Sequence, residues 1–173
     1  GATSLGQAST LPLWRVRGQV SYLDEGAVPE LPFVLCREAY LTRAAGGIHS
    51  AGATYDLHDH DPQLRQSSHD ENLSKVRSLL GDAGLVPDAP LRGRVGFRCV
   101  GPDRLPLVGA LPDATPTGRA ERLRDLPRHP GLYGLLGYAS RGLIWAPLAA
   151  ALLAAQLEGA PLPLQRTLVE ALG

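Results

Sequence analysis

The sequence of 173 residues predicts an α+β fold: an antiparallel sheet with a flanking helix, followed by a strand-turn-helix unit. Four segments are predicted to be strands, and alternating apolar and polar residues, typical of half-buried strands, mark the first and the last of them. These segments are 13–23, 33–41, 48–55 and 94–100. An amphipathic helical pattern spans 68–80. A short apolar strand at 131–137 then leads through a turn of small residues into an apolar helix.

The first three strands are expected to form an antiparallel meander, with a hairpin turn at 44–47. Gly52 interrupts the third strand and indicates a bulge or a close backbone approach. In the helix, Ser68 as N-cap and Glu71 three residues later form a predicted capping box, and Gly81 ends the helix.

Composition excludes several classes of protein. Hydrophobic residues make up 44% of the chain, charged residues 20%, and the formal net charge is zero, which is ordinary globular composition. The balanced charge lacks the basic footprint of most nucleic-acid binders, so any RNA contacts are expected to be local. No signal peptide opens the chain, and the most apolar run, 142–157, is too short to cross a bilayer. We therefore expect a soluble, cytoplasmic protein.

Arg98 is the most informative single residue. It lies among apolar neighbours in the alternating segment 94–100, which ends at the Gly101-Pro102 turn before a second strand at 105–109. A guanidinium in such a place needs an anionic partner that accepts two hydrogen bonds. Two interpretations stay open: a structural salt bridge, or a clamp for the carboxylate of a substrate.

The acidic and histidine-rich stretch 56–61 offers a possible metal site. His58 and His60 would share a face if this stretch were a strand. The spacing matches no ordered ligand set, and the flanking residues are typical of a loop, so we expect a solvated polar loop and no metal. Cys36 and Cys99 also lack the short spacing of a metal knuckle.

The C-terminal third contains a surface excursion at 112–130, a strand at 131–137 and a turn at 138–142. The helix after it, 146–157, has Pro147 near its start and is apolar nearly all round, so we expect burial on more than one side. A strand, a glycine-containing turn and a buried helix can aim a helix N-terminus at a ligand, although many α/β folds contain this unit.

These pieces resemble the FAD-dependent amine oxidases of the D-amino-acid oxidase and glycine oxidase type. The residues that carry the resemblance are 96–98 with 103–109, 38–42, and 137–147. Within that family, the amino-acid sequence is similar to the oxidoreductase part of bifunctional tRNA-modification enzymes. The matching stretches are 16–21, 52–55, 69–73, 94–99, 102–106 and 140–149.

The resemblance implies a division of the chain: 1–10 as the tail of an FAD lobe, 11–101 as a substrate-binding lobe, and 102–173 as the return into the FAD lobe. The family opens with a strand-GxGxxG-helix unit that holds the FAD pyrophosphate. No Gly-x-Gly-x-x-Gly occurs in these 173 residues. The chain is therefore expected to be part of a longer FAD enzyme, and to be inactive and free of FAD by itself.

The resemblance also implies the reaction and the site. The expected substrate is the carboxymethylaminomethyl group of the tRNA wobble uridine, which loses its carboxymethyl group as glyoxylate. A methyltransferase domain on the same chain, which uses S-adenosyl-L-methionine, would then methylate the amine. Arg98 and Tyr40 are the implied substrate-binding residues, although Tyr40 as strand packing remains open. The implied FAD contacts are Gly109, Gly137, Ser140, Arg141, Gly142, Leu143 and Ile144.

Two alternatives remain. One keeps the flavin fold but oxidises a free amino acid such as glycine, sarcosine or a D-amino acid. The other is an inert fragment or interaction module without FAD, which the missing glycine motif favours for this chain alone.

Overall fold

The computed structural model describes residues 2–81, 91–113 and 125–173, and it divides into two compact units. Unit 1 comprises Gly1–Trp14 and Arg98–Gly173, and unit 2 comprises Arg15–Phe97. The boundaries expected from the sequence fall after residues 10 and 101. The assignment of these parts as FAD lobe and substrate lobe remains a prediction.

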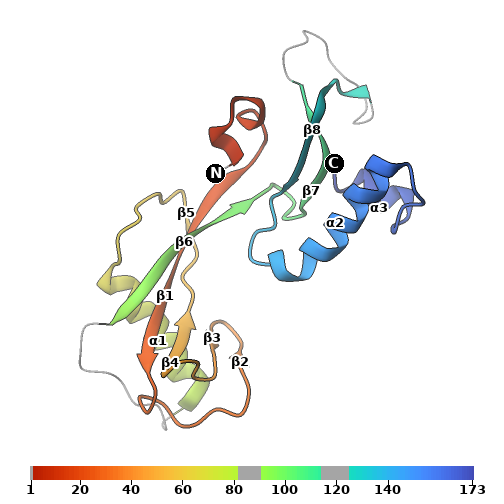
Figure 1. Ribbon diagram of the computed structural model, residues 1–173. Helices are drawn as coiled ribbons and strands as arrows, with labels where there is room; N and C mark the ends of the chain where they lie inside the picture. The colour runs from red at the N-terminus through yellow and green to blue at the C-terminus, as the bar shows by residue number, and fades with distance from the viewer. Residues whose placement is uncertain (1, 82–90, 114–124) are drawn as a thin grey trace. The chain divides into compact units, whose positions relative to one another are not determined.

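Unit 2 is built on an antiparallel sheet with one helix against it (Figure 1). Its elements are β1 Trp14–Asp24, β2 Leu35–Cys36, β3 Tyr40–Leu41, β4 Ile48–Gly52, β5 Asp56–Leu57, α1 Gln66–Leu80 and β6 Arg92–Val100, whose last three residues belong to unit 1. The strand order is β2-β3-β4-β1-β5, with β6 paired to β1. The predicted α+β class with antiparallel strands is confirmed.

Two details of the expected sheet are wrong. The segment 33–41 is not one strand, because residues 37–39 bend and β2 folds back onto β3, with Leu35 opposite Leu41. The order is not that of a meander either, since β1 pairs with β4 and not with the strand that follows it. The tight turn at 45–47 fixes β3 beside β4, whereas the long connection after β1 imposes no neighbour.

Gly52 is paired regularly with Val20 in the β1–β4 ladder. A Cβ at position 52 would lie 3.4 Å from both Cα and Cγ2 of Val20, which is close to ordinary contact distance. The expected bulge or close approach therefore remains a prediction.

The predicted capping box of α1 is wrong. The helix begins at Gln66, its N-cap is Arg65, and no side chain caps it. The Gln19 side chain binds both sides of the Arg65 peptide unit: Arg65 N–H donates to Gln19 Oε1 at 2.9 Å, and Gln19 Nε2 donates to Arg65 O at 2.9 Å. This clamp from β1 replaces a local cap, and Ser68 lies inside the first turn. Gly81, with φ 64°, ends the helix as predicted.

The core of unit 2 joins one face of the sheet to α1. Its buried members are Leu23, Val28, Leu31, Leu41, Ala51, Leu73 and Val76. Burial of these side chains contributes about 1.5–3 kcal/mol for each large aliphatic residue. The sheet therefore has one face packed on α1 and one face turned away from it.

Unit 1 contains a β-hairpin with helices against it (Figure 1). Its elements are η1 Ala2–Ser4, η2 Gly6–Ala8, β7 Leu107–Pro112, β8 Arg128–Leu136, α2 Gly142–Glu158 and α3 Arg166–Glu170. Val108, Ala149, Leu152 and Leu172 form the core between β7 and the helices. Ala8, Leu11 and Leu111 form a second cluster on the N-terminal segment. Of the expected excursion 112–130, residues 114–124 lie outside the described part, and 128–130 already belong to β8.

The expectation for α2 is wrong in two respects. It begins at Gly142, four residues before the predicted start, and Pro147 lies within it. Among the described residues it buries one stripe only, made of Ala149, Leu152 and Ala155. Leu143 is 97% exposed and Ile144 is 77% exposed. The helix is apolar nearly all round, but within the described part of this chain nothing covers its other faces.

Candidate functional site

Arg98 lies beside the turn that precedes α2, and both belong to unit 1. Its neighbour Cys99 accepts a hydrogen bond from Ala139 N–H through the backbone carbonyl, at 2.9 Å, and Val100 forms an antiparallel bridge with Tyr138. Arg98 itself is half-buried. Arg98 is therefore next in sequence to Cys99, whose backbone is hydrogen-bonded to the turn at 137–141. The resemblance implies that this turn contacts FAD.

The turn at 137–141 has a backbone that restricts which residues fit. Gly137 has φ 75°, and a Cβ there would lie 3.4 Å from Leu13 Cδ2 and 3.5 Å from Leu105 O. Ala139 also has a positive φ, 52°. The side chain of Arg141 donates from Nη2 to Arg104 O at 2.6 Å, which ties the end of the turn to the loop after β6. The turn is thus bound at Ala139 by the end of β6 and at Arg141 by the loop after β6.

The N-terminus of α2 is accessible. Arg141 O accepts hydrogen bonds from both Ile144 N–H at 3.1 Å and Trp145 N–H at 3.0 Å. The amides of Gly142 and Leu143 come before this first helical bond, so they belong to the donors that a helix start leaves without an intrahelical partner. With the helix dipole behind them, they present partial positive charge to an electron-rich group. Ser140 and Arg141 at this end are exposed.

Gly109, the remaining residue implied for the cofactor, lies elsewhere in unit 1. It is inside β7, opposite Gly134 of β8, and its φ of 140° favours glycine. It lines an apolar cavity of about 280 Å³ whose walls include Leu11, Leu111 and Arg128. Gly109 is therefore not grouped with the turn at 137–141.

Tyr40 lies in unit 2, on the sheet face turned away from α1. It pairs with Gly52 across the β3–β4 ladder, and Gly52 pairs with Val20 across the β4–β1 ladder. Directly paired residues of an antiparallel sheet point to the same face. The neighbouring row, Leu41 opposite Ala51, is fully buried in the core against α1, so Tyr40 points the other way. Tyr40 is half-buried.

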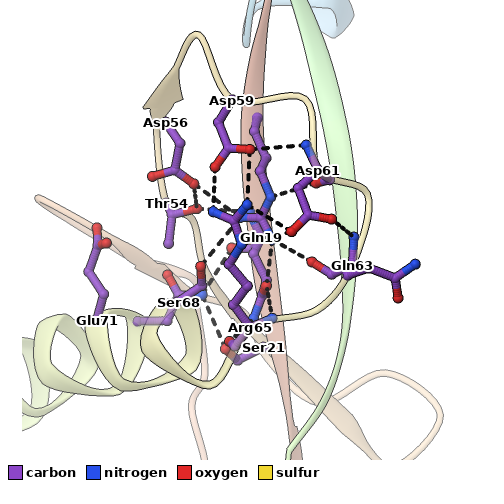
Figure 2. A network of polar contacts seen from close by, with 12 residues as sticks. Gln19, Ser21, Thr54, Asp56, Asp59, Asp61, Gln63, Arg65, Ser68 and Glu71 are labelled. Atoms are coloured by element: carbon purple, nitrogen blue, oxygen red, sulfur yellow. Dashed lines mark hydrogen bonds and ion pairs between the residues drawn. The ribbon is translucent and has the colours of Figure 1, made fainter.

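A second polar site, around Arg17, was missed by the sequence analysis (Figure 2). The Arg17 side chain is fully buried, and all its donor nitrogens have acceptors. Nε donates to Asp61 O at 2.9 Å, and Nη1 donates to Asp56 Oδ2 at 3.1 Å and to Ser68 Oγ at 3.3 Å. Nη2 donates to Gln19 Oε1 at 3.0 Å and to Gln63 O at 2.7 Å. Buried charge is tolerated when it is paired in this way.

Arg65 holds the same loop from its other side (Figure 2). It forms ion pairs with Asp59, and with Asp61 at 2.8 Å. The side-chain hydrogen bond from Arg65 lowers the pKa of the Asp59 carboxyl. The pKa of Asp61 is lowered first by the backbone N–H of Gln63 and then by Arg65. The stretch expected as a loop, 56–61, is therefore β5 followed by an ordered loop that Arg17 and Arg65 bind, with His58 and His60 exposed.

The Arg17 network continues along β1 toward α1. Asn72 Nδ2 donates to Gln19 O at 2.9 Å and to Ser21 Oγ at 3.1 Å. Ser21 Oγ lies 2.8 Å from His69 Nδ1, and burial lowers the pKa of His69. The signal that could have found this network is the run Arg17, Gln19, Ser21, three polar residues at alternate positions of a strand.

Metal-binding clusters and membrane-spanning helices are both absent from the described residues. No group of three or more His, Cys, Asp or Glu side chains in this part of the chain could hold a metal ion. No helix within it is long and apolar enough to span a membrane.

Known proteins match this chain over almost its whole length. The protein named tRNA 5-methylaminomethyl-2-thiouridine biosynthesis bifunctional protein MnmC from Azoarcus sp. is 48% identical over 173 residues, covering 99% of this chain and 27% of that protein. The protein of the same name from Aromatoleum aromaticum is 47% identical over the same length. The chain thus spans about a quarter of the length of these relatives.

Solved structures show the same fold at lower identity. Glycine oxidase from Geobacillus kaustophilus superposes with a TM-score of 0.68 at 20% identity, over 97% of this chain and 42% of that chain. Iminodiacetate oxidase from Chelativorans sp. gives 0.65 at 22% identity, over 90% and 38%. The model of the DAO family, FAD dependent oxidoreductase, matches residues 1–156. This chain therefore belongs to the DAO family of FAD-dependent oxidoreductases.

Proposed function

We propose that this chain is the substrate-recognising part of an enzyme that removes the carboxymethyl group from 5-carboxymethylaminomethyl(-2-thio)uridine at position 34 of tRNA. The products are the aminomethyl uridine and glyoxylate. The enzyme would be bifunctional, with a methyltransferase domain that uses S-adenosyl-L-methionine acting on the amine. The observation that carries the proposal is the 48% identity, across 99% of the chain, to a protein named for that modification.

Arg98 has the chemistry that this substrate requires. The group that leaves carries a carboxylate, and a guanidinium binds a carboxylate through two parallel hydrogen bonds. Its strand is tied to the turn before α2 by the Cys99–Ala139 hydrogen bond. In our proposal Arg98 orients the substrate so that the carbon between amine and carboxylate faces the cofactor, and orientation supplies much of the rate. Tyr40 would donate a further hydrogen bond to the substrate.

The residues at the start of α2 fit the electron-rich edge of a flavin. The amides of Gly142 and Leu143 are free of intrahelical partners by their position, and Ser140 and Arg141 leave this end accessible. When bound, FAD supplies the hydride acceptor that converts the secondary amine into an imine. Water then adds to the imine carbon, the C–N bond breaks, and glyoxylate leaves. The helix N-terminus would stabilise the negative charge that hydride transfer brings to the ring.

The decisive experiment compares substrates on the intact enzyme. Purified enzyme is incubated with tRNA that carries the carboxymethylaminomethyl group, or with glycine, sarcosine or D-alanine, and the keto acid product (glyoxylate, or pyruvate from D-alanine) and the modified nucleoside are quantified. We expect glyoxylate release in proportion to loss of the carboxymethyl group from tRNA. Faster turnover of a free amino acid would support the alternative amine oxidase, and a colourless protein that does not respond to added FAD would oppose both.

A further inference from the structure

The sheet face turned away from α1 carries two tyrosines on neighbouring ladders of unit 2. Tyr22 of β1 pairs with Ser50, and Tyr40 of β3 pairs with Gly52. The β1 residues that alternate with Tyr22 point toward α1: Ser21 binds His69 and Asn72, and Leu23 lies in the core. Tyr22 and Tyr40 therefore share the other face, and both residues are half-buried.

The same face carries arginines of β6, the strand on the far edge of β1. A Cβ at Gly93 would lie 2.9 Å from His69 Cε1, so position 93 points toward α1. The residues on either side of it, Arg92 and Arg94, point the opposite way. The same Cβ would lie 2.3 Å from Val20 O, so Gly93 lies beside Val20 of β1. Val20 is two residues before Tyr22 and on the same face of the sheet.

The charge on this face is available for a partner. Arg94 is exposed and forms no ion pair with any residue in the described part of the chain. Arg92 pairs with Asp24 at 2.9 Å, but the two side chains are 68% and 79% exposed. An ion pair this exposed contributes little to stability, so Arg92 can bind another anion in place of Asp24.

We propose that this face, defined by Tyr22, Tyr40, Arg92 and Arg94, is a contact surface for single-stranded nucleotides of the tRNA substrate. Aromatic rings on an exposed sheet stack on unpaired bases, and guanidinium groups bind the phosphates between them. The inference rests on the proposed function for the identity of the RNA. It also answers how a chain of zero net charge could bind RNA, because the contacts are local.

The test measures binding and turnover separately in the intact enzyme. Binding of an anticodon stem-loop RNA is followed by fluorescence anisotropy at several salt concentrations, for Arg94→Ala, Tyr22→Ala and Tyr22→Phe. Arg77→Ala is the matched control, because Arg77 is an exposed arginine of α1. Steady-state oxidation is measured with the modified tRNA and with the modified nucleoside alone.

We expect Arg94→Ala to weaken RNA binding about tenfold and to lower the slope of log affinity against log salt by about one phosphate contact. Tyr22→Ala should weaken binding about tenfold, and Tyr22→Phe should restore it because the ring still stacks. The KM for tRNA should rise in both alanine variants, while kcat and turnover of the nucleoside stay unchanged.

Two outcomes separate this inference from the proposed function. RNA binding by Arg94→Ala and Tyr22→Ala that equals that of Arg77→Ala overturns the contact surface, even if tRNA is oxidised. Loss of binding in those variants, with neither tRNA nor nucleoside oxidised by the parent enzyme, supports the surface and rejects the proposed reaction.

Discussion

Arg17 and Arg98 both lie within long strands, but their surroundings differ. Arg17 in β1 is fully buried, and five hydrogen bonds to protein acceptors use its guanidinium. Arg98 in β6 is half-buried and lies next to the turn before α2. The comparison teaches that the position of an arginine within a strand does not reveal its role. What distinguishes the two is burial: the Arg17 side chain is fully enclosed, whereas Arg98 keeps part of its surface accessible.

Replacement of Arg17 should give the largest effect on stability. Arg17→Met removes the guanidinium, so that Asp56, Gln19 and two loop carbonyls each lose one donor. Removal of one partner from a buried ionic network typically costs about 3–5 kcal/mol, so we expect the free energy of unfolding to fall by about that amount. Urea denaturation followed by circular dichroism measures it.

The matched control for this variant is Arg15→Met, two residues earlier in the same strand and exposed. It should change the free energy of unfolding by less than about 0.5 kcal/mol. Equal losses in the two variants would show that the Arg17 network is not what holds the 56–63 loop against β1.

Replacement of Arg98 should reverse the pattern, with a loss of activity and little loss of stability. Arg98→Lys keeps the charge and loses the planar fork, so turnover of the carboxylate substrate should fall more than tenfold, about 1.4 kcal/mol in kcat/KM. Glyoxylate release from modified tRNA measures it, with Arg77→Lys as the control. Unchanged kinetics in Arg98→Lys would remove this residue from the substrate site.

The elements that rest on local patterns were predictable from the sequence. The apolar stripe of α1 and its end at Gly81 follow from spacing that one sequence displays, and so does the turn between β3 and β4. The start of α1 does not follow from local spacing. Gln19, 46 positions away, binds the backbone N–H and C=O of Arg65, the residue before the helix, and this contact takes the place of the predicted capping box. Long-range partners of this kind leave no trace in the spacing near residue 68.

The candidate site was predictable in part for the same reason. Arg98 and the turn at 137–141 were singled out from residue chemistry and from likeness to a family, and a backbone hydrogen bond places their segments together. The Arg17 network was not foreseen, since its acceptors include carbonyl groups at 61 and 63 that any residue type could supply. The helix α2 was misjudged because an all-round apolar pattern requires a cover that the described part of the chain does not provide.

The smallest expected effect concerns Arg65, which is one third exposed and holds the loop from outside. Its hydrogen bonds lower the pKa of Asp59 and contribute to the lowered pKa of Asp61. A carboxyl whose pKa is depressed in the folded state stabilises the fold above its unfolded pKa, about 4, and loses that contribution as the pH falls through the folded pKa. Arg65→Gln should therefore lower the urea midpoint at pH 7, and the difference from the parent should shrink as the pH falls below about 4 and the two carboxyls are protonated. A difference that does not change as the two carboxyls are protonated would mean that the Arg65 side chain acts through packing and not through the two carboxylates.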